Sequence, residues 1–148
     1  MRNTSKNIRV FRSLTLATLG SLVLEFVLGM YTALFVEFPD TVVNGNGWAW
    51  SMKESPILMV HVLLGSLLVL LTILTVIFGF TSHSKPAIVW SVTGFVLTMV
   101  AYMGGSIFLS NVAEDNYSFL MALGFMGSLL AYGVAFYLTR LSILSPQD

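Results

Sequence analysis

Four long runs of apolar residues, separated by short polar segments, dominate the sequence. They cover about residues 13–36, 56–80, 87–110 and 117–139, and only the first contains a charged side chain, Glu25. An α-helix rises about 1.5 Å per residue, so about 20 residues cross a bilayer core. The runs are continuously apolar rather than alternating, which is typical of membrane helices and not of membrane strands. The pattern predicts four transmembrane helices.

The connections between the runs predict how these helices are arranged. Two of them, residues 81–86 and 111–116, are short, and short links make successive helices antiparallel neighbours. We therefore expect an all-α integral membrane protein, an antiparallel up-down four-helix transmembrane bundle that forms a single domain over residues 1–148.

The remaining connection, residues 38–55, joins the first and second runs and is long enough to cover one end of the bundle. It contains the turn-prone stretch 44–47 and then Trp48 and Trp50. Tryptophan favours the membrane interface. This outer loop is expected to lie flat over the bundle as an interfacial anchor, with a lid over a site as the alternative.

The distribution of basic residues predicts the orientation. Of seven lysines and arginines, only Lys53 lies in the long connection, and the other six lie on the opposite side of the predicted bundle. Segments rich in lysine and arginine stay in the cytoplasm. We expect both termini to be cytoplasmic, the long connection to be external, and the membrane to be the plasma (cytoplasmic) membrane.

Composition excludes several classes of protein. Hydrophobic residues make up 56% of the chain and charged residues only 9%, whereas soluble domains carry about 25% charged residues. A soluble enzyme and a nucleic-acid-binding protein are therefore excluded. The absence of cysteine excludes disulfides, thiolate metal sites and iron–sulfur clusters. No nucleotide-binding or hydrolase motif is present, which favours a protein that is not an enzyme.

Two ionisable side chains fall inside the predicted spans. His61 lies about five residues into the second span, near the outer face, and Glu25 lies near the middle of the first. Such groups are costly in a bilayer and indicate function by default. His61 is either a neutral structural histidine, a ligand to haem iron or another metal, or part of a proton relay. Glu25 is either a protonated carboxyl bonded to a neighbouring helix, or a carboxyl that carries protons or orients a ligand.

The depths of the two residues bear on whether they meet. Glu25 is expected to lie about six residues deeper than His61, roughly 9 Å. This predicts no direct contact, although a path through water stays open. No lysine or arginine lies in the four windows, so an unpaired Glu25 is expected to be protonated.

Methionines and glycines near the depth of His61 complete the candidate site. A methionine thioether is an axial ligand for haem iron, although filling gaps in an apolar core is its commoner role. Glycines let helices pack closely in lipid, and they also leave room for a flat macrocycle. The candidate cofactor-binding residues are His61, Met103, Met121, Gly65, Gly104 and Gly105, with His61 as the candidate metal ligand and haem b as the candidate cofactor.

The sequence also contains a weak internal repeat. Residues 59–68 align with residues 121–130, and residues 26–29 align more loosely with residues 101–104. Two duplicated helical hairpins related by a pseudo-two-fold axis along the membrane normal explain this. In that alignment His61 corresponds to Leu123, so Leu123 is predicted to face the same interior.

The first hairpin resembles a known family. Glu25 precedes Gly29 by four residues, and after the outer connection His61 precedes Gly65 by four. This is similar to one four-helix half of the haem A synthase family, in which the second and fourth helices of each bundle each supply a histidine to a haem. The resemblance implies the four-helix fold and carries His61 over as the first haem ligand.

The resemblance does not extend to the family's chemistry. The position of the second haem ligand falls on Leu123, which cannot bind iron. The carboxylate that the family carries just ahead of its first-bundle histidine is also missing, since Glu54 is too far from His61. The resemblance therefore argues against haem-oxidising chemistry.

Three functions remain as hypotheses. The leading one is a non-catalytic or accessory membrane subunit with an interior polar site near the outer face. The second is a haem-b-binding or electron-transfer module with His61 as axial ligand and Met103 or Met121 as its partner. The third, a proton-coupled carrier, rests on Glu25 alone. The expected partners are the lipid bilayer and either other membrane subunits or further copies of this chain, and no nucleic acid.

Overall fold

The computed structural model of the chain describes residues 2–39, 47–110 and 115–144, and all regular structure in these ranges is helical. The prediction of an all-α protein is confirmed. Within the described ranges the helices are α1 (Arg2–Phe35), α2 (Gly47–Glu54), α3 (Pro56–Thr81), α4 (Lys85–Ser110) and α5 (Asp115–Leu144).

Four of these helices are long and apolar enough to cross a membrane, as the hydropathy pattern predicts. The candidate spans are Lys6–Phe35, Pro56–Thr81, Lys85–Ser110 and Asn116–Arg140. The chain therefore has the make-up of an integral membrane protein. The helix α1 begins well before residue 13, where the first apolar run starts, because hydropathy marks only the apolar part of a helix that continues into polar sequence.

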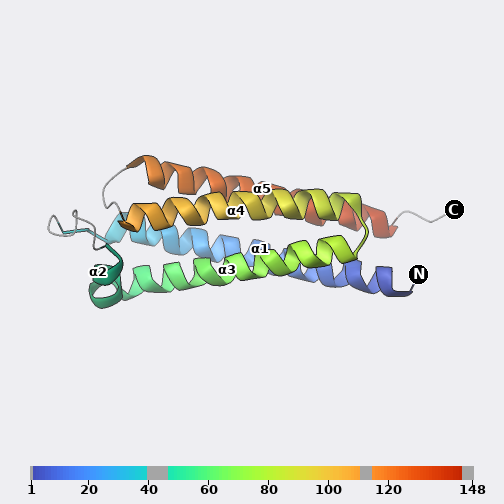
Figure 1. The fold of residues 1–148 in the computed structure, drawn as a ribbon, viewed down its shortest axis with the longest axis horizontal. Coiled ribbons are helices and arrows are strands. Elements are labelled where there is room, and N and C mark those ends of the chain that lie inside the picture. The colour runs from blue at the N-terminus through green and yellow to red at the C-terminus, as the bar shows by residue number, and fades with distance from the viewer. Residues whose placement is uncertain (1, 40–46, 111–114, 145–148) are drawn as a thin grey trace.

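The four long helices lie side by side, and consecutive ones run in opposite directions (Figure 1). The helix α4 packs most extensively on α5 and α1 packs on α3, while contacts between α3 and α4 and between α1 and α5 join the two pairs. The beginning of α1 and the end of α5 lie at one end of the molecule, here called the terminal end, and α2 lies at the opposite end, here called the α2 end (Figure 1).

The long connection is not wholly a loop. Its second half forms the eight-residue helix α2, which packs against α3 and α4. The turn-prone residues 44–46 lie outside the described residues. The sequence did not indicate this helix because a segment of one to two turns carries too little periodicity to be distinguished from a loop.

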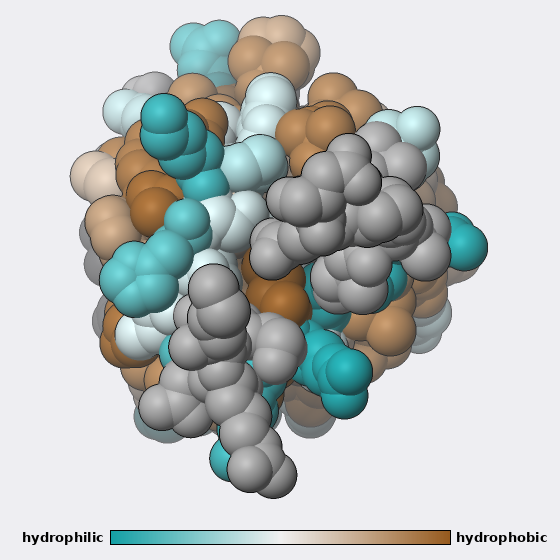
Figure 2. Space-filling model, turned by 90° about the vertical axis from the view of Figure 1, so that its right-hand side faces the viewer, coloured by the Kyte–Doolittle hydropathy of each residue, from teal (hydrophilic) through white to brown (hydrophobic). Residues whose placement is uncertain are grey.

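In this bundle many large apolar side chains lie on the outside and many polar side chains lie inside. Large apolar side chains such as Leu67, Val89 and Leu130 are exposed, whereas many threonine and serine side chains are fully buried. Figure 2 shows hydrophilic residues gathered on the terminal end and hydrophobic ones along the sides. An apolar exterior around a polar interior suits lipid as the surrounding solvent, because polar side chains in membrane helices turn toward neighbouring helices.

Buried hydroxyls link the helices at the middle of the bundle and toward the terminal end. The Thr18 and Thr75 hydroxyl oxygens lie 3.2 Å apart across α1 and α3, and those of Thr98 and Ser128 lie 3.1 Å apart across α4 and α5. The fully buried Tyr132 hydroxyl faces the Thr72 and Thr98 side chains without completing a well-aligned hydrogen bond to either. Such interhelical contacts stabilise membrane bundles by about 0.6 kcal/mol each on average.

Glycines bring α4 and α5 close together. A Cβ atom added at Gly124 would lie 2.6 Å from the backbone nitrogen of Ala101 and 2.7 Å from the carbonyl oxygen of Leu97. A Cβ atom at Gly94 would lie 2.6 Å from the ring of Tyr132. Only glycine permits these approaches, so the relative rotation of α4 and α5 is fixed by backbone-to-backbone packing.

Candidate functional site

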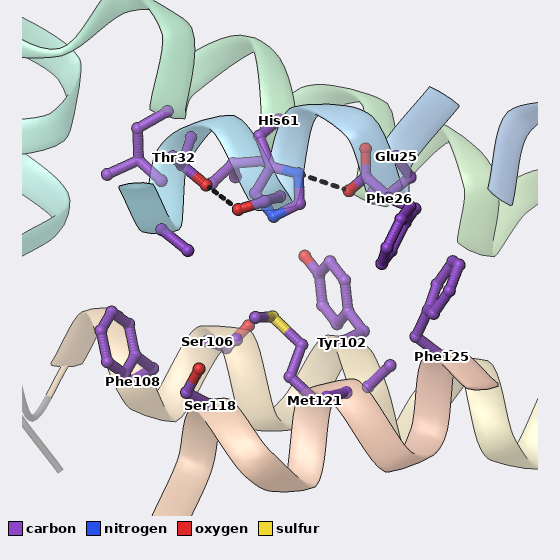
Figure 3. A pocket seen from close by; sticks show the side chains of 18 of the residues that line it. Glu25, Phe26, Thr32, His61, Tyr102, Ser106, Phe108, Ser118, Met121 and Phe125 are labelled. Atoms are coloured by element: carbon purple, nitrogen blue, oxygen red, sulfur yellow. Dashed lines mark hydrogen bonds and ion pairs between the residues drawn. The ribbon is translucent and has the colours of Figure 1, made fainter. Parts of the chain in front are cut away.

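The two ionisable residues of the predicted spans meet inside the bundle. His61 Nδ1 on α3 lies 3.1 Å from Glu25 Oε1 on α1 (Figure 3). The prediction that they make no direct contact is wrong. His61 on α3 packs against Gly29 of α1, and Gly29 follows Glu25 by four residues. Along the helix axis, His61 is therefore displaced from Glu25 by only about 6 Å. Two side chains that lean toward each other bridge this offset.

Each member of the pair packs over a glycine of the opposite helix. A Cβ atom at Gly29 would lie 3.3 Å from His61 Cε1, and a Cβ atom at Gly65 would lie 2.8 Å from Glu25 Oε1. The four-residue spacing of each polar residue from its glycine therefore has a structural meaning. In an antiparallel helix pair it places each ionisable side chain in the space that the other helix leaves open.

The pair retains unused hydrogen-bonding capacity. Only 13% of the Glu25 side chain and 15% of the His61 side chain is exposed. Glu25 Oε2 is buried and has no hydrogen-bond partner in the described structure, and the short contact of His61 Nδ1 with Oε1 is not aligned as a hydrogen bond. Buried polar atoms are almost always satisfied, so an unpartnered carboxyl oxygen calls for an explanation.

The pair lies in the wall of a cavity of about 520 Å³ between the helix pairs α1–α3 and α4–α5. All four long helices contribute to the wall, and Phe38 and Trp48 contribute at the α2 end. Most of the surface is apolar. Its polar side chains, besides the pair, are Thr32, Trp48, Thr98, Tyr102, Ser106, Ser118 and Ser128.

Aromatic and sulfur-containing side chains face the pair from across the cavity. The Tyr102 ring on α4 points toward Glu25 and His61, and the Met121 side chain on α5 lies on the same opposite wall (Figure 3). The Tyr102 and Ser66 hydroxyl oxygens are 3.4 Å apart. Phe26 and Phe125 stack with their ring centroids 5.4 Å apart beside Glu25.

The α2 end of the cavity is covered by aromatic residues. Trp48 Nε1 donates a hydrogen bond of 3.3 Å to Ser110 Oγ at the end of α4. The Phe38 ring packs against Trp50 and Phe108, with centroid separations of 5.1 and 5.6 Å. These contacts place α2 over the cavity, while a role of the tryptophans as interfacial anchors stays a prediction.

The structure brings together four of the six candidate cofactor-binding residues. His61, Gly65, Gly105 and Met121 line the cavity. Met103 does not, because its side chain is 55% exposed on the outside of the bundle. A Cβ atom at Gly104 would lie 3.0 Å from the backbone nitrogen of Met121, so this glycine serves the packing of α4 on α5.

The predicted interior position of Leu123 is wrong. Its side chain is 53% exposed and lines no part of the cavity, whereas the neighbouring residues Met121 and Ala122 do. The contact of Gly124 with the α4 backbone determines which face of α5 is turned inward. That face does not match the face of α3 that carries His61.

Metal ligands are few at this site. Among the described residues there is no group of three or more histidine, cysteine, aspartate or glutamate side chains that could hold a metal ion.

No protein-family model matches the chain, and neither a curated protein nor a solved structure matches it. What the site can do is therefore set by its own chemistry, which is one carboxyl and one imidazole in a mostly apolar cavity that also presents several hydroxyl groups.

Proposed function

We propose that this chain is a small non-catalytic integral membrane protein, an accessory to other membrane subunits or to further copies of itself, whose interior site binds a small molecule. The four spans form an antiparallel up-down bundle in this proposal. The observation that carries it is the Glu25–His61 pair in the wall of a cavity of about 520 Å³.

The cavity has the properties of a ligand site rather than of a packing fault. Small-molecule pockets hold about 300–1,000 Å³ and combine apolar walls with a few convergent polar groups. Buried hydroxyl groups nearer the terminal end pair with each other, as those of Thr18 and Thr75 do, and so need no further partner. The unused acceptor capacity of the Glu25 carboxyl, which lies in the cavity wall, supports a polar partner that enters the cavity.

A cavity-filling substitution tests this function. Ser106 lines the cavity and its side chain points into it (Figure 3). In native mass spectrometry after extraction in mild detergent, we expect a co-purifying small molecule on the unmodified protein and none on Ser106→Phe. The matched control is Val96→Phe, which adds the same ring on the exposed side of α4 and should retain the molecule. An unmodified protein without any adduct, or an adduct that persists in Ser106→Phe, would contradict the proposal.

The same proposal includes an orientation. We place the α2 end outside and the terminal end in the cytoplasm of the plasma membrane, because six of the seven lysines and arginines lie toward the terminal end. A reporter fused after Asp148 should then read as cytoplasmic, and one inserted within residues 40–46 as external. Reversed readings from the two reporters would refute the orientation.

Haem b is a second candidate for the bound molecule. A carboxylate beside one imidazole nitrogen orients the ring so that the other nitrogen can ligate iron, and the imidazole edge of His61 faces Met121 across the cavity (Figure 3). One residue that could hold iron therefore lies on each side of the cavity, but no lysine or arginine lines the cavity to pair with the propionates. A reduced-minus-oxidised absorption spectrum distinguishes haem b from another small molecule. A haem band that is lost in His61→Ala would favour haem.

A further inference from the structure

We infer that the cavity takes a lipophilic organic cation, a molecule with an apolar body and a single protonated amine that Glu25 binds. This inference rests on the proposed function and names the class of its ligand. Three features of the described residues carry it: the charge of the cavity, the unused acceptor capacity of the Glu25 carboxyl and the aromatic rings beside it.

The charged residues of the cavity are unbalanced. Glu25 is the one acidic side chain in the wall, and neither lysine nor arginine lines it. The one basic side chain that lines it is His61, which lies 3.1 Å from Glu25 and carries a charge only when protonated. With His61 neutral, an ionised Glu25 has no counter-charge, and a ligand cation supplies one. Hydrogen bonds between ions of opposite charge are about twice as strong as neutral ones.

The carboxyl group of Glu25 has acceptor capacity that His61 does not use. His61 Nδ1 lies against Oε1 at 3.1 Å, while Oε2 has no partner. An acceptor of this kind needs a donor, and an ammonium group offers up to three N–H donors and no acceptor. Oε1, the oxygen on the cavity side of the carboxyl (Figure 3), has acceptor capacity beyond its contact with His61 and can accept from such a group, and His61 acts as a positioning residue for it.

The rings around Glu25 suit a cation with an apolar body. Phe26 and Phe125 stack beside the carboxyl, and Tyr102 faces it from α4 (Figure 3). A cation near an aromatic face is attracted by the negative face of the ring, and more strongly when it is desolvated. Toward the α2 end the wall is formed by Phe38, Phe108 and Met30, which leaves an apolar space for the rest of the molecule.

A matched pair of probes separates charge from hydrophobicity. The two are 4-phenylbutylamine and 4-phenylbutan-1-ol, which differ only in the ammonium and hydroxyl groups. Binding is measured with the full chain in bilayer discs of zwitterionic lipid, through the fluorescence of Trp48 in a Trp50→Phe, Trp90→Phe background, since Trp48 lines the cavity. We expect the amine to bind at least tenfold more tightly than the alcohol, and Ser106→Phe to weaken both.

Substitutions at the pair then test the role of the carboxyl. Glu25→Gln should reduce the preference for the amine to within about twofold, while Glu54→Gln, which removes the same charge on the exposed surface of α2, should leave it unchanged. If Glu25→Gln does not fold, Gly65→Ala gives the same test. Its methyl group would lie 2.8 Å from Glu25 Oε1 and displace the carboxyl, so it should weaken the amine more than the alcohol.

The outcomes distinguish the two levels of the proposal. Equal binding of amine and alcohol, or a preference for the amine that survives Glu25→Gln, overturns the inferred ligand class and leaves the cavity as a binding site. If neither probe binds the unmodified chain and Ser106→Phe changes nothing, the proposed function fails together with this inference.

Discussion

Glu25→Leu and His61→Leu are each expected to destabilise the protein by about 1–3 kcal/mol, and the double variant is expected to cost less than either. Each single variant leaves one member of a buried pair without its neighbour, since the two side chains meet at 3.1 Å. The double variant removes both polar groups from the apolar wall. The free energy of unfolding in bilayers or mixed detergent micelles gives the comparison.

A control substitution shows whether this coupling is specific. Ser118 lies across the cavity from Glu25 (Figure 3), and substitutions at separated sites usually add. Glu25→Leu combined with Ser118→Ala should therefore cost the sum of the two single effects. Additive behaviour of Glu25→Leu with His61→Leu would instead show that the two side chains do not interact.

Gly124→Ala is expected to lower the free energy of unfolding by about 2–3 kcal/mol, because the new methyl group would overlap the α4 backbone. Its Cβ atom would lie 2.6 Å from the nitrogen of Ala101, and a backbone atom cannot move aside as a flexible side chain does. Titration with SDS, followed by far-ultraviolet circular dichroism, measures the loss.

Gly133→Ala is the matched control on the same helix. No atom outside its own helical turn lies within 4 Å of the added Cβ position. Alanine is a better helix former than glycine by up to about 1 kcal/mol, so this variant should be neutral or slightly more stable. Equal losses at both glycines would mean that α5 does not pack on α4 through Gly124.

The four spans could be predicted because their signal is local. A run of about 20 apolar residues identifies a membrane helix without reference to any other part of the chain. The rotation of each helix about its axis is not local. Leu123 and Ala122 are both apolar, yet only Ala122 lines the cavity, because a close contact of Gly124 with α4 decides which of them faces inward.

Only part of the site could be predicted from the sequence, because the positions of helices relative to one another are not local properties. His61 and Glu25 stood out as ionisable residues in apolar windows, but their contact depends on the register between α1 and α3. The equal spacing from Glu25 to Gly29 and from His61 to Gly65 carries that register, since it interlocks in an antiparallel pair. The Tyr102 ring, which faces the pair from α4, carries no comparable signal because tyrosine is common in membrane helices.

Solid-state NMR of the protein in lipid bilayers tests most directly whether Glu25 and His61 form one site. The chain contains only two histidines, His61 and His83, and His83 lies in the turn between α3 and α4 at the terminal end. With ¹⁵N-labelled histidine and ¹³C-labelled glutamate, we predict strong dipolar dephasing of one histidine Nδ1 by a glutamate carboxyl carbon, because Nδ1 lies 3.1 Å from the Oε1 bonded to that carbon, and its loss in Glu25→Gln. Absence of dephasing at both histidines of the unmodified protein would contradict the pair and the site built on it.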